Sequence, residues 1–76
     1  MNEKIMEILK EINEEILTYT GNNMLEDGLV NSFSFISLVS DIEDEFDIEI
    51  DESLMEKEYF GNMDRIISTV KSLVED

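Results

Sequence analysis

The stretch that decides the fold runs over twelve residues and reads Gly28-Leu29-Val30-Asn31-Ser32-Phe33-Ser34-Phe35-Ile36-Ser37-Leu38-Val39. Asn31 is a favourable N-cap residue, so the stretch predicts a helix that begins directly after it. Ser32 would then lie beside backbone N–H groups without an intrahelical partner, at the positive end of the helix dipole. Because such a position suits a phosphate, Ser32 is the first candidate for a functional residue.

The apolar residues of this segment continue at helical spacing as far as Phe46. The expected buried positions are Phe35, Leu38, Val39, Ile42 and Phe46. Phe33 falls outside this stripe, and an exposed aromatic side chain indicates a contact site. We therefore expect a partner-binding surface on the other faces of the helix, formed by Phe33, Ser37, Ser40, Asp41 and Asp44.

A first helix is expected before this segment, from about Glu3 to about Thr18. Its apolar residues again recur at helical spacing and are Ile5, Ile8, Leu9, Ile12 and Ile16. The run Gly21-Asn22-Asn23 ends it. The segment 22–30 is then a long loop, which we expect three apolar residues to hold against the core: Met24, Leu25 and Leu29.

Two more helices are expected towards the C-terminus. Ser53 and Glu56 have the spacing of a capping box, which predicts a short third helix that ends by Gly61. Asn62 would cap the last helix, whose apolar stripe consists of Met63, Ile66, Ile67, Val70, Leu73 and Val74. Between the second and third helices, Ile48 and Ile50 alternate with acidic residues, and we interpret this segment as a loop with two buried anchors. The expected fold is all-α, a small four-helix bundle with three main helices, one short third helix and a long first loop.

Length and composition restrict the function. A chain of 76 residues is enough for a single domain, which we assign to residues 1–76. The chain has no Cys, so a disulfide framework and a thiolate metal site are excluded, and no His, so the usual general base and the commonest metal ligand are missing. The three glycines are isolated and form no phosphate-binding loop. We therefore expect no independent catalysis and assign no catalytic residue.

Charge is the strongest feature of the composition. Twenty acidic residues face five basic ones, for a net charge of −15, and no basic residue occurs between Glu11 and Glu56. Such a surface repels nucleic acid and anionic membranes and attracts proteins with basic patches. No apolar run is long enough to span a bilayer, and the N-terminus lacks the pattern of a signal peptide. We expect a cytoplasmic monomer that neither binds nucleic acid nor inserts into membranes.

A calcium site is the main alternative for the acidic run after the second helix. Starting from Asp47, acidic residues fall at several ligand positions of an EF-hand loop, which are Asp47, Glu49, Asp51 and Glu58. The sixth position, which requires Gly for a sharp turn, is Glu52. The pattern therefore argues against an EF-hand, favours only loose binding of divalent cations, and leads us to assign no metal ligand.

Taken together, these residues resemble the acyl carrier protein family, which includes acyl, peptidyl and D-alanyl carriers. The family's motif is usually Asp-Ser-Leu or Asp-Ser-Met after a Gly-apolar pair, and here it reads Leu29-Val30-Asn31-Ser32-Phe33. The run Ile42-Glu43-Asp44-Glu45-Phe46-Asp47-Ile48-Glu49-Ile50 is similar to the acidic end of the family's second helix. The resemblance covers almost the whole chain, in helix order, spacing and charge.

The resemblance implies a phosphoprotein that carries thioesters. Ser32 would receive 4′-phosphopantetheine from coenzyme A through a Mg²⁺-dependent phosphopantetheinyl transferase, with Asn31 and Phe33 at the flanking motif positions. The thiol of the arm would carry an acyl or aminoacyl group to loading and transferring enzymes with basic patches, and tethering would raise the effective concentration of that group. The resemblance leaves the pathway open among fatty acid, polyketide and nonribosomal peptide biosynthesis and D-alanylation.

The sequence departs from the family pattern at two places. Asn31 replaces the usual Asp, which removes a charge beside Ser32, and Ser34 and Ser37 are neutral where fatty-acid carriers are often acidic. The segment 53–65 is closer to D-alanyl and other stand-alone carriers. Asn31 also leaves open a second hypothesis, an acidic helical adaptor that binds a basic protein partner and carries no prosthetic group.

Overall fold

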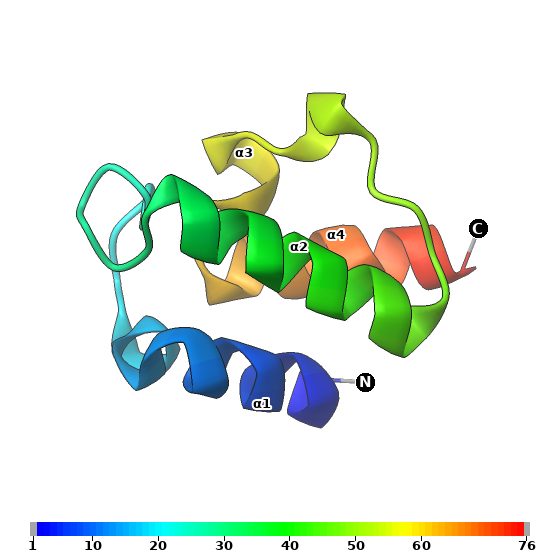
Figure 1. Cartoon of the computed structure of the whole chain (residues 1–76), viewed down its shortest axis with the longest axis horizontal. Helices are drawn as coiled ribbons and strands as arrows, with labels where there is room; N and C mark the ends of the chain where they lie inside the picture. The colour runs from blue at the N-terminus through cyan, green and yellow to red at the C-terminus, as the bar shows by residue number, and fades with distance from the viewer. Residues whose placement is uncertain (1, 76) are drawn as a thin grey trace.

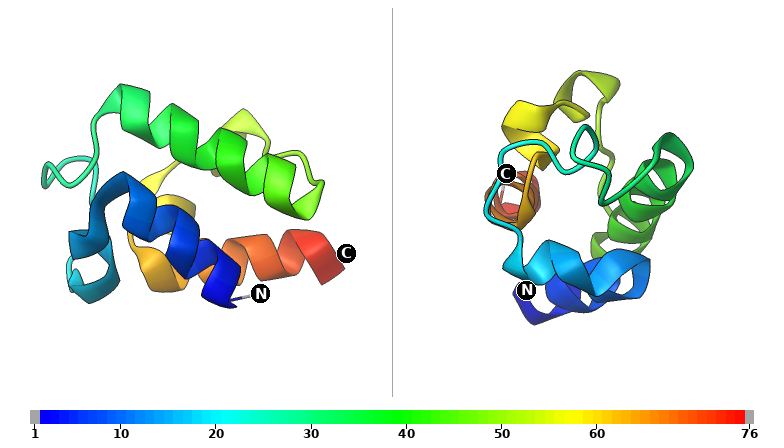
Figure 2. Two further views of the ribbon diagram at one scale, coloured as in Figure 1. Left: turned by 60° about the horizontal axis from the view of Figure 1, so that its bottom comes forward. Right: turned by 90° about the vertical axis from the view of Figure 1, so that its left-hand side faces the viewer.

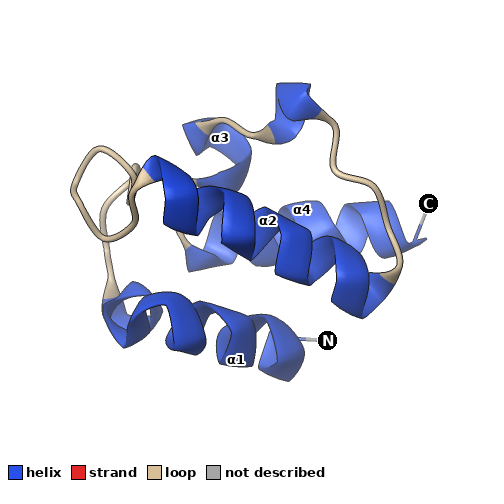
Figure 3. Ribbon diagram, viewed as in Figure 1, coloured by secondary structure: helices blue, strands red, loops and turns tan. Residues whose placement is uncertain are grey.

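The chain forms four α-helices and two short 3₁₀ segments, described here for residues 2–75 from a computed structural model (Figure 1). The elements are α1 (Asn2–Asn13), η1 (Glu14–Thr18), α2 (Ser32–Phe46), η2 (Glu52–Leu54), α3 (Lys57–Phe60) and α4 (Met63–Glu75). No strand occurs in this range (Figure 3). The expected all-α bundle, with three main helices and a short third one, is confirmed.

The helices are arranged so that one end of the molecule carries the start of α2. Helices α1 and α2 run in opposite directions, and α4 lies behind them and runs in the same direction as α2 (Figures 1 and 2). The loop 20–31 therefore lies at the end of the bundle opposite to the two termini (Figure 1). This loop leads into Ser32.

Twelve apolar side chains form one buried core. They are Ile5, Leu9, Ile16, Met24, Val30, Leu38, Val39, Ile42, Ile50, Phe60, Ile66 and Val70. Two aromatic residues of α2 that we expected to be buried, Phe35 and Phe46, are only half-buried and pack against this core from its edge. Phe35 contacts Phe60 of α3 edge to face, with the ring centroids 5.8 Å apart, which is a favourable geometry for an aromatic pair.

The first helix is not continuous, as its apolar periodicity suggested. Helix α1 ends at Asn13, whose backbone is extended (φ −167°, ψ 111°), and the chain continues as the 3₁₀ segment η1. The Asn13 side chain accepts a hydrogen bond from the backbone N–H of Glu15 (3.0 Å) and so caps the new segment. Ile16 nevertheless reaches the core from η1, so the apolar spacing predicted burial correctly and missed the break.

The Ser53/Glu56 capping box is wrong. Asp51, not Ser53, caps η2, because its carboxylate accepts the N–H of Ser53 (2.9 Å). Helix α3 begins only at Lys57, where Glu56 occupies the N-cap position without a side-chain hydrogen bond. The end of this helix at Gly61 is confirmed. The turns that Asp51 and Ser53 would cap overlap in sequence. The hydrogen bond that forms is the one to Asp51, the more N-terminal of the two residues.

Two residues lie on the surface against expectation: Leu25, expected to hold the first loop, and Val74, expected in the apolar stripe of the last helix. Leu25 is 42% exposed and Val74 is 40% exposed, so neither holds its segment against the core. The loop 20–30 is held instead by Met24, which is fully buried, with Leu29 half-buried beside it. The loop after α2 behaves as expected, with Ile50 buried and Ile48 packed partly against the core. The N-cap role of Asn62 is also confirmed, through the N–H of Arg65 (2.9 Å).

Candidate functional site

The start of α2 is capped by Asn31, as the sequence predicted. The side-chain oxygen of Asn31 accepts the N–H of Ser34 (2.7 Å), and its carbonyl accepts the N–H of Phe35 (2.9 Å). Ser32 is the first residue of the helix and is exposed. Because Asn31 supplies the cap, the Ser32 hydroxyl is not needed to begin the helix and remains available for chemistry.

The surroundings of Ser32 suit an anionic group. The first turn of α2 contains no acidic residue, and no charged residue occurs anywhere in the segment 28–40, although the whole chain has a net charge of −15. A carboxylate in that turn would repel a phosphate and offset the positive end of the helix dipole. The residues at this position therefore fit a phosphate-linked group on Ser32.

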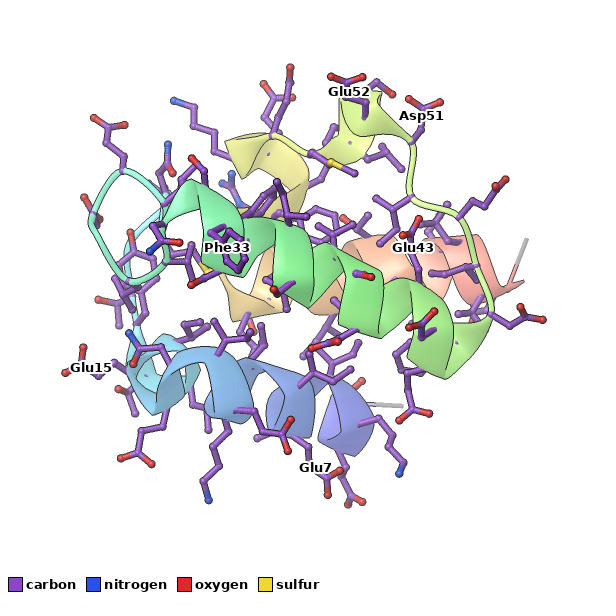
Figure 4. The ribbon with its side chains drawn as sticks, viewed as in Figure 1. Glu7, Glu15, Phe33, Glu43, Asp51 and Glu52 are labelled. Carbon is purple, nitrogen blue, oxygen red and sulfur yellow. The ribbon has the colours of Figure 1, made fainter. Side chains whose placement is uncertain are left out.

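Two large apolar side chains stand exposed beside Ser32. Phe33 is 81% exposed and Ile36 is 65% exposed. They are three residues apart on α2 and so occupy neighbouring positions on its surface; Figure 4 labels Phe33 at the N-terminal half of the helix. We call Phe33 and Ile36 the apolar pair. Ile36 was missed from the sequence, although it lies outside the predicted core stripe and three residues after Phe33.

The other residues of the expected partner surface divide into two groups. Ser40, Asp41 and Asp44 are exposed, as predicted, whereas Ser37 is half-buried and offers less surface than expected. Asp41 and Asp44 also line a groove between α1 and α2, together with Ile8, Glu11 and Glu45. The outer surface of α2 is thus neutral and partly apolar near Ser32 and acidic towards its C-terminal half.

A depression of about 280 Å³ lies between the loop 20–30, α2 and α3. Its apolar lining is Leu25, Phe35, Met55 and Phe60, and its polar lining is Asn23, Glu56 and Lys57. Of these residues Phe35 belongs to α2, where it lies about one helical turn beyond Ser32.

The loop before α2 is ordered by a tyrosine. The hydroxyl of Tyr19 donates a hydrogen bond to the Asp27 carboxylate and accepts one from the N–H of Asn23 (3.1 Å). The hydrogen bond to Asp27 is the main reason why the pKa of Tyr19 is raised above its ordinary value, since it stabilises the protonated phenol. Tyr19 thereby joins both ends of the turn 23–27.

Over residues 2–75, which include the acidic run after α2, no group of three or more His, Cys, Asp or Glu side chains is placed to hold a metal ion. Two carboxylates bind backbone N–H groups of this segment: Glu43 of α2 accepts that of Ile50 (2.7 Å), and Asp51 accepts that of Ser53. The bond from Ser53 lowers the pKa of Asp51 below its ordinary value. Among the helices described, none has the length and apolar character needed to cross a membrane.

Known proteins of similar sequence are carriers. No family model matches the chain. The chain is 29% identical over 73 residues to the D-alanyl carrier protein of Listeria welshimeri serovar 6b, which covers 93% of this chain and 94% of the relative. It is 29% identical over 75 residues to the D-alanyl carrier protein of Leuconostoc citreum, which covers 97% of this chain and 96% of the relative.

Carrier proteins are not enzymes, so these relatives agree with the expectation that the chain has no catalytic activity of its own. The matches run through every helix and through the loop before α2, because they extend over nearly the full length of both proteins. Together with the all-α fold, they confirm the resemblance to the acyl carrier protein family that was found in the sequence.

Proposed function

We propose that residues 1–76 are a carrier domain that holds an aminoacyl group as a thioester on 4′-phosphopantetheine attached to Ser32. The observation that carries this proposal is the exposed Ser32 at the start of a helix that Asn31 already caps, in a segment free of charge. Ser32 Oγ would form a phosphodiester with the pantetheine-bearing phosphate of coenzyme A and lose its proton as 3′,5′-ADP leaves. The arm supplies a thiol, which the chain, without Cys, otherwise lacks.

D-alanine is the cargo that the comparisons favour, because the relatives that match along their whole length are named D-alanyl carrier proteins. The first turn of α2 also departs from fatty-acid carriers, which often have acidic residues where this chain has Ser34 and Ser37. A fatty acyl, polyketide or peptidyl cargo is the alternative that the loading experiment below tests.

The enzymes that act on this carrier would dock on the outer surface of α2. The apolar pair Phe33 and Ile36 offers contact area beside the attachment residue, and Asp41 and Asp44 offer charge one to two turns further on. Charge pairs of this kind mainly accelerate encounter and orient the partner, whereas buried apolar contacts supply more of the affinity. We therefore propose partners, including the phosphopantetheinyl transferase, with an apolar pocket flanked by a basic patch.

The first test is the intact mass of the protein after incubation with coenzyme A, Mg²⁺ and a promiscuous phosphopantetheinyl transferase. We expect the parent to gain one phosphopantetheinyl group and Ser32→Ala to gain none. Ser40→Ala is the matched control, because Ser40 is an exposed serine on the same helix, and it should be modified like the parent. Modification of Ser32→Ala at the parental rate would refute Ser32 as the attachment residue.

The second test identifies the cargo. The modified protein is incubated with ATP, a D-alanine-activating ligase and either D-alanine or L-alanine, and, in parallel, with malonyl-coenzyme A and a malonyl transferase. We expect a mass gain of one alanyl group with D-alanine, which hydroxylamine removes because it cleaves thioesters. If the protein accepts a malonyl group and no D-alanyl group, the aminoacyl assignment is refuted and the carrier role is retained.

The alternative function is an acidic adaptor without a prosthetic group, and Asn31 in place of the family's Asp is the observation that favours it. If a control carrier is modified and the parent is not, Asn31→Asp separates the two functions. Since Asp is as good an N-cap as Asn, the variant changes the charge beside Ser32 and keeps the helix start. Modification of Asn31→Asp alone indicates a carrier that needs a specialised transferase, and its failure supports the adaptor.

A further inference from the structure

Two asparagines have the same pair of roles at opposite ends of the loop 20–30. Asn13 caps η1 and Asn62 caps α4, each with its side-chain oxygen. Each also uses its side-chain nitrogen to donate a hydrogen bond to a loop carbonyl. Asn13 binds the carbonyl of Leu29 (2.9 Å), and Asn62 binds the carbonyl of Gly21 (3.0 Å). Both side chains are half-buried, so water competes little for these bonds.

Between these two attachments the loop is closed on itself around Met24. The carbonyl of Met24 accepts the N–H groups of Leu29 (2.9 Å) and Val30 (3.4 Å), and its N–H donates to the carbonyl of Gly61 (2.9 Å). Gly28 adopts φ +85°, a conformation that side chains disfavour, and so allows the chain to turn back towards Met24. The loop thus has a defined path although it contains no helix or strand.

The two attachments differ in their distance from the candidate attachment residue. Leu29 is three residues before Ser32, and the chain between them is already held, since Val30 is 4% exposed and Asn31 caps α2. Gly21 lies at the other end of the loop, beyond the closure around Met24. We therefore expect a change at Asn13 to affect Ser32 more than a change at Asn62.

We propose that Asn13 is a positioning residue for Ser32, which fixes the last turn of the loop through the Leu29 carbonyl and so presents the hydroxyl in the orientation that the modifying enzyme needs. The inference rests on the proposed function, because it assumes that Ser32 is the residue modified. It also gives the break between α1 and η1 a functional role. The chain leaves α-helical geometry at Asn13, the residue whose side-chain amide binds the Leu29 carbonyl in the loop.

The test compares Asn13→Asp with Asn62→Asp. In each variant the carboxylate keeps the oxygen that caps the following segment and loses the N–H₂ donor to the loop, and each variant adds one negative charge at a helical N-terminus. The two variants release opposite ends of the loop. If Asn13→Asp is not folded by circular dichroism, Asn13→Ser replaces it, since serine is a good cap, adds no charge and has no amide to reach Leu29.

The first readout is the steady-state kinetics of modification by the transferase with coenzyme A. We expect the apparent KM for Asn13→Asp to rise about three- to tenfold, the factor that corresponds to one net hydrogen bond, with kcat unchanged, because only a fraction of the molecules would present Ser32 correctly. We expect the KM for Asn62→Asp to stay within about twofold of the parent, even where thermal melts show that the two variants lose similar stability.

The second readout is amide hydrogen exchange by NMR, which needs no enzyme. The N–H groups of Leu29 and Val30 should exchange faster in Asn13→Asp than in the parent and remain protected in Asn62→Asp. If the parent is modified but the two variants have equal KM values or equal exchange rates, the positioning role alone is refuted. A parent that is never modified, beside a control carrier that is, would overturn the proposed function and the positioning role together.

Discussion

At the scale of single residues, Asp47 is unfavourable for stability in both its backbone conformation and its charge. It follows α2 directly and adopts the left-handed conformation (φ 52°, ψ 51°), the one residue other than glycine with a positive φ among residues 2–75. Its N–H donates to the carbonyl of Glu43 and so closes the helix. Its carboxylate, however, lies at the negative end of the helix dipole, where a negative charge is unfavourable.

Replacement of Asp47 by glycine should therefore stabilise the protein. Glycine adopts the left-handed conformation without steric cost and is the commonest residue at this position. We expect Asp47→Gly to raise the free energy of unfolding by about 1 kcal/mol, measured by urea denaturation at neutral pH. Asp47→Asn, which removes the charge and keeps a side chain, should give a smaller gain. An Asp47→Gly variant less stable than Asp47→Asn would contradict the role of the backbone conformation.

At the scale of an element, α2 combines two binding surfaces in one helix. Its N-terminal half carries Ser32 and the apolar pair with no charge, and its C-terminal half carries the acidic residues that face the groove towards α1. Burying a large apolar side chain in a partner is worth more than an exposed charge pair. The apolar pair should therefore govern how tightly a partner enzyme binds, and the acidic half how fast it arrives.

This division predicts different effects for different substitutions. Phe33→Ala and Ile36→Ala should each raise the KM for loading by a partner enzyme by about five- to thirtyfold, which corresponds to roughly 1–2 kcal/mol of lost contact. Asp41→Asn should instead lower the dependence of the association rate on salt. Met6→Ala is the matched control, since Met6 is an exposed apolar residue on α1. Equal effects of Met6→Ala and Phe33→Ala would argue against docking on α2.

At the scale of the whole molecule, charge opposes the fold. The net charge of −15 is distributed over a molecule of 30 × 25 × 20 Å. Within residues 2–75 one ion pair offsets it, between Lys4 of α1 and Glu45 of α2 at 4.0 Å, and both side chains are well exposed. Such a pair contributes little. Repulsion among the carboxylates therefore has to be balanced by the single apolar core.

Thermal stability should therefore increase with salt. The screening length is about 30 Å at 0.01 M salt, as long as the molecule, and about 10 Å at 0.1 M. We expect Tm, followed by circular dichroism, to rise by roughly 4–8 °C between these concentrations, which corresponds to about 1 kcal/mol. Mg²⁺ should act by the same screening. The control is the same pair of melts near pH 4, close to the sequence pI of about 4.1, where the effect should disappear.

The sequence predicted the helices better than their ends. Apolar spacing identified Ile5, Leu9 and Ile16 as core residues, although α1 breaks between them, because periodicity reports which side is buried and not how the backbone closes its hydrogen bonds. The capping pattern was right for Asn31 and Asn62 and wrong for Ser53, since Asp51 competes for the same turn. At the candidate site, Phe33 was recognised because it lies outside the apolar stripe of α2. Ile36 also lies outside this stripe and was overlooked.

The sequence by itself determined the local features of this protein. These are the start of α2 at Ser32, the neutral segment 28–40, the exposed Phe33 and the overall charge, all of which depend on neighbouring residues or on composition. Only the tertiary structure decided how the loop 20–30 is held. Asn13 meets Leu29 and Asn62 meets Gly21 across 16 and 41 residues of sequence. Hydrogen bonds over such separations follow from packing of the helices and leave no periodic pattern in the chain.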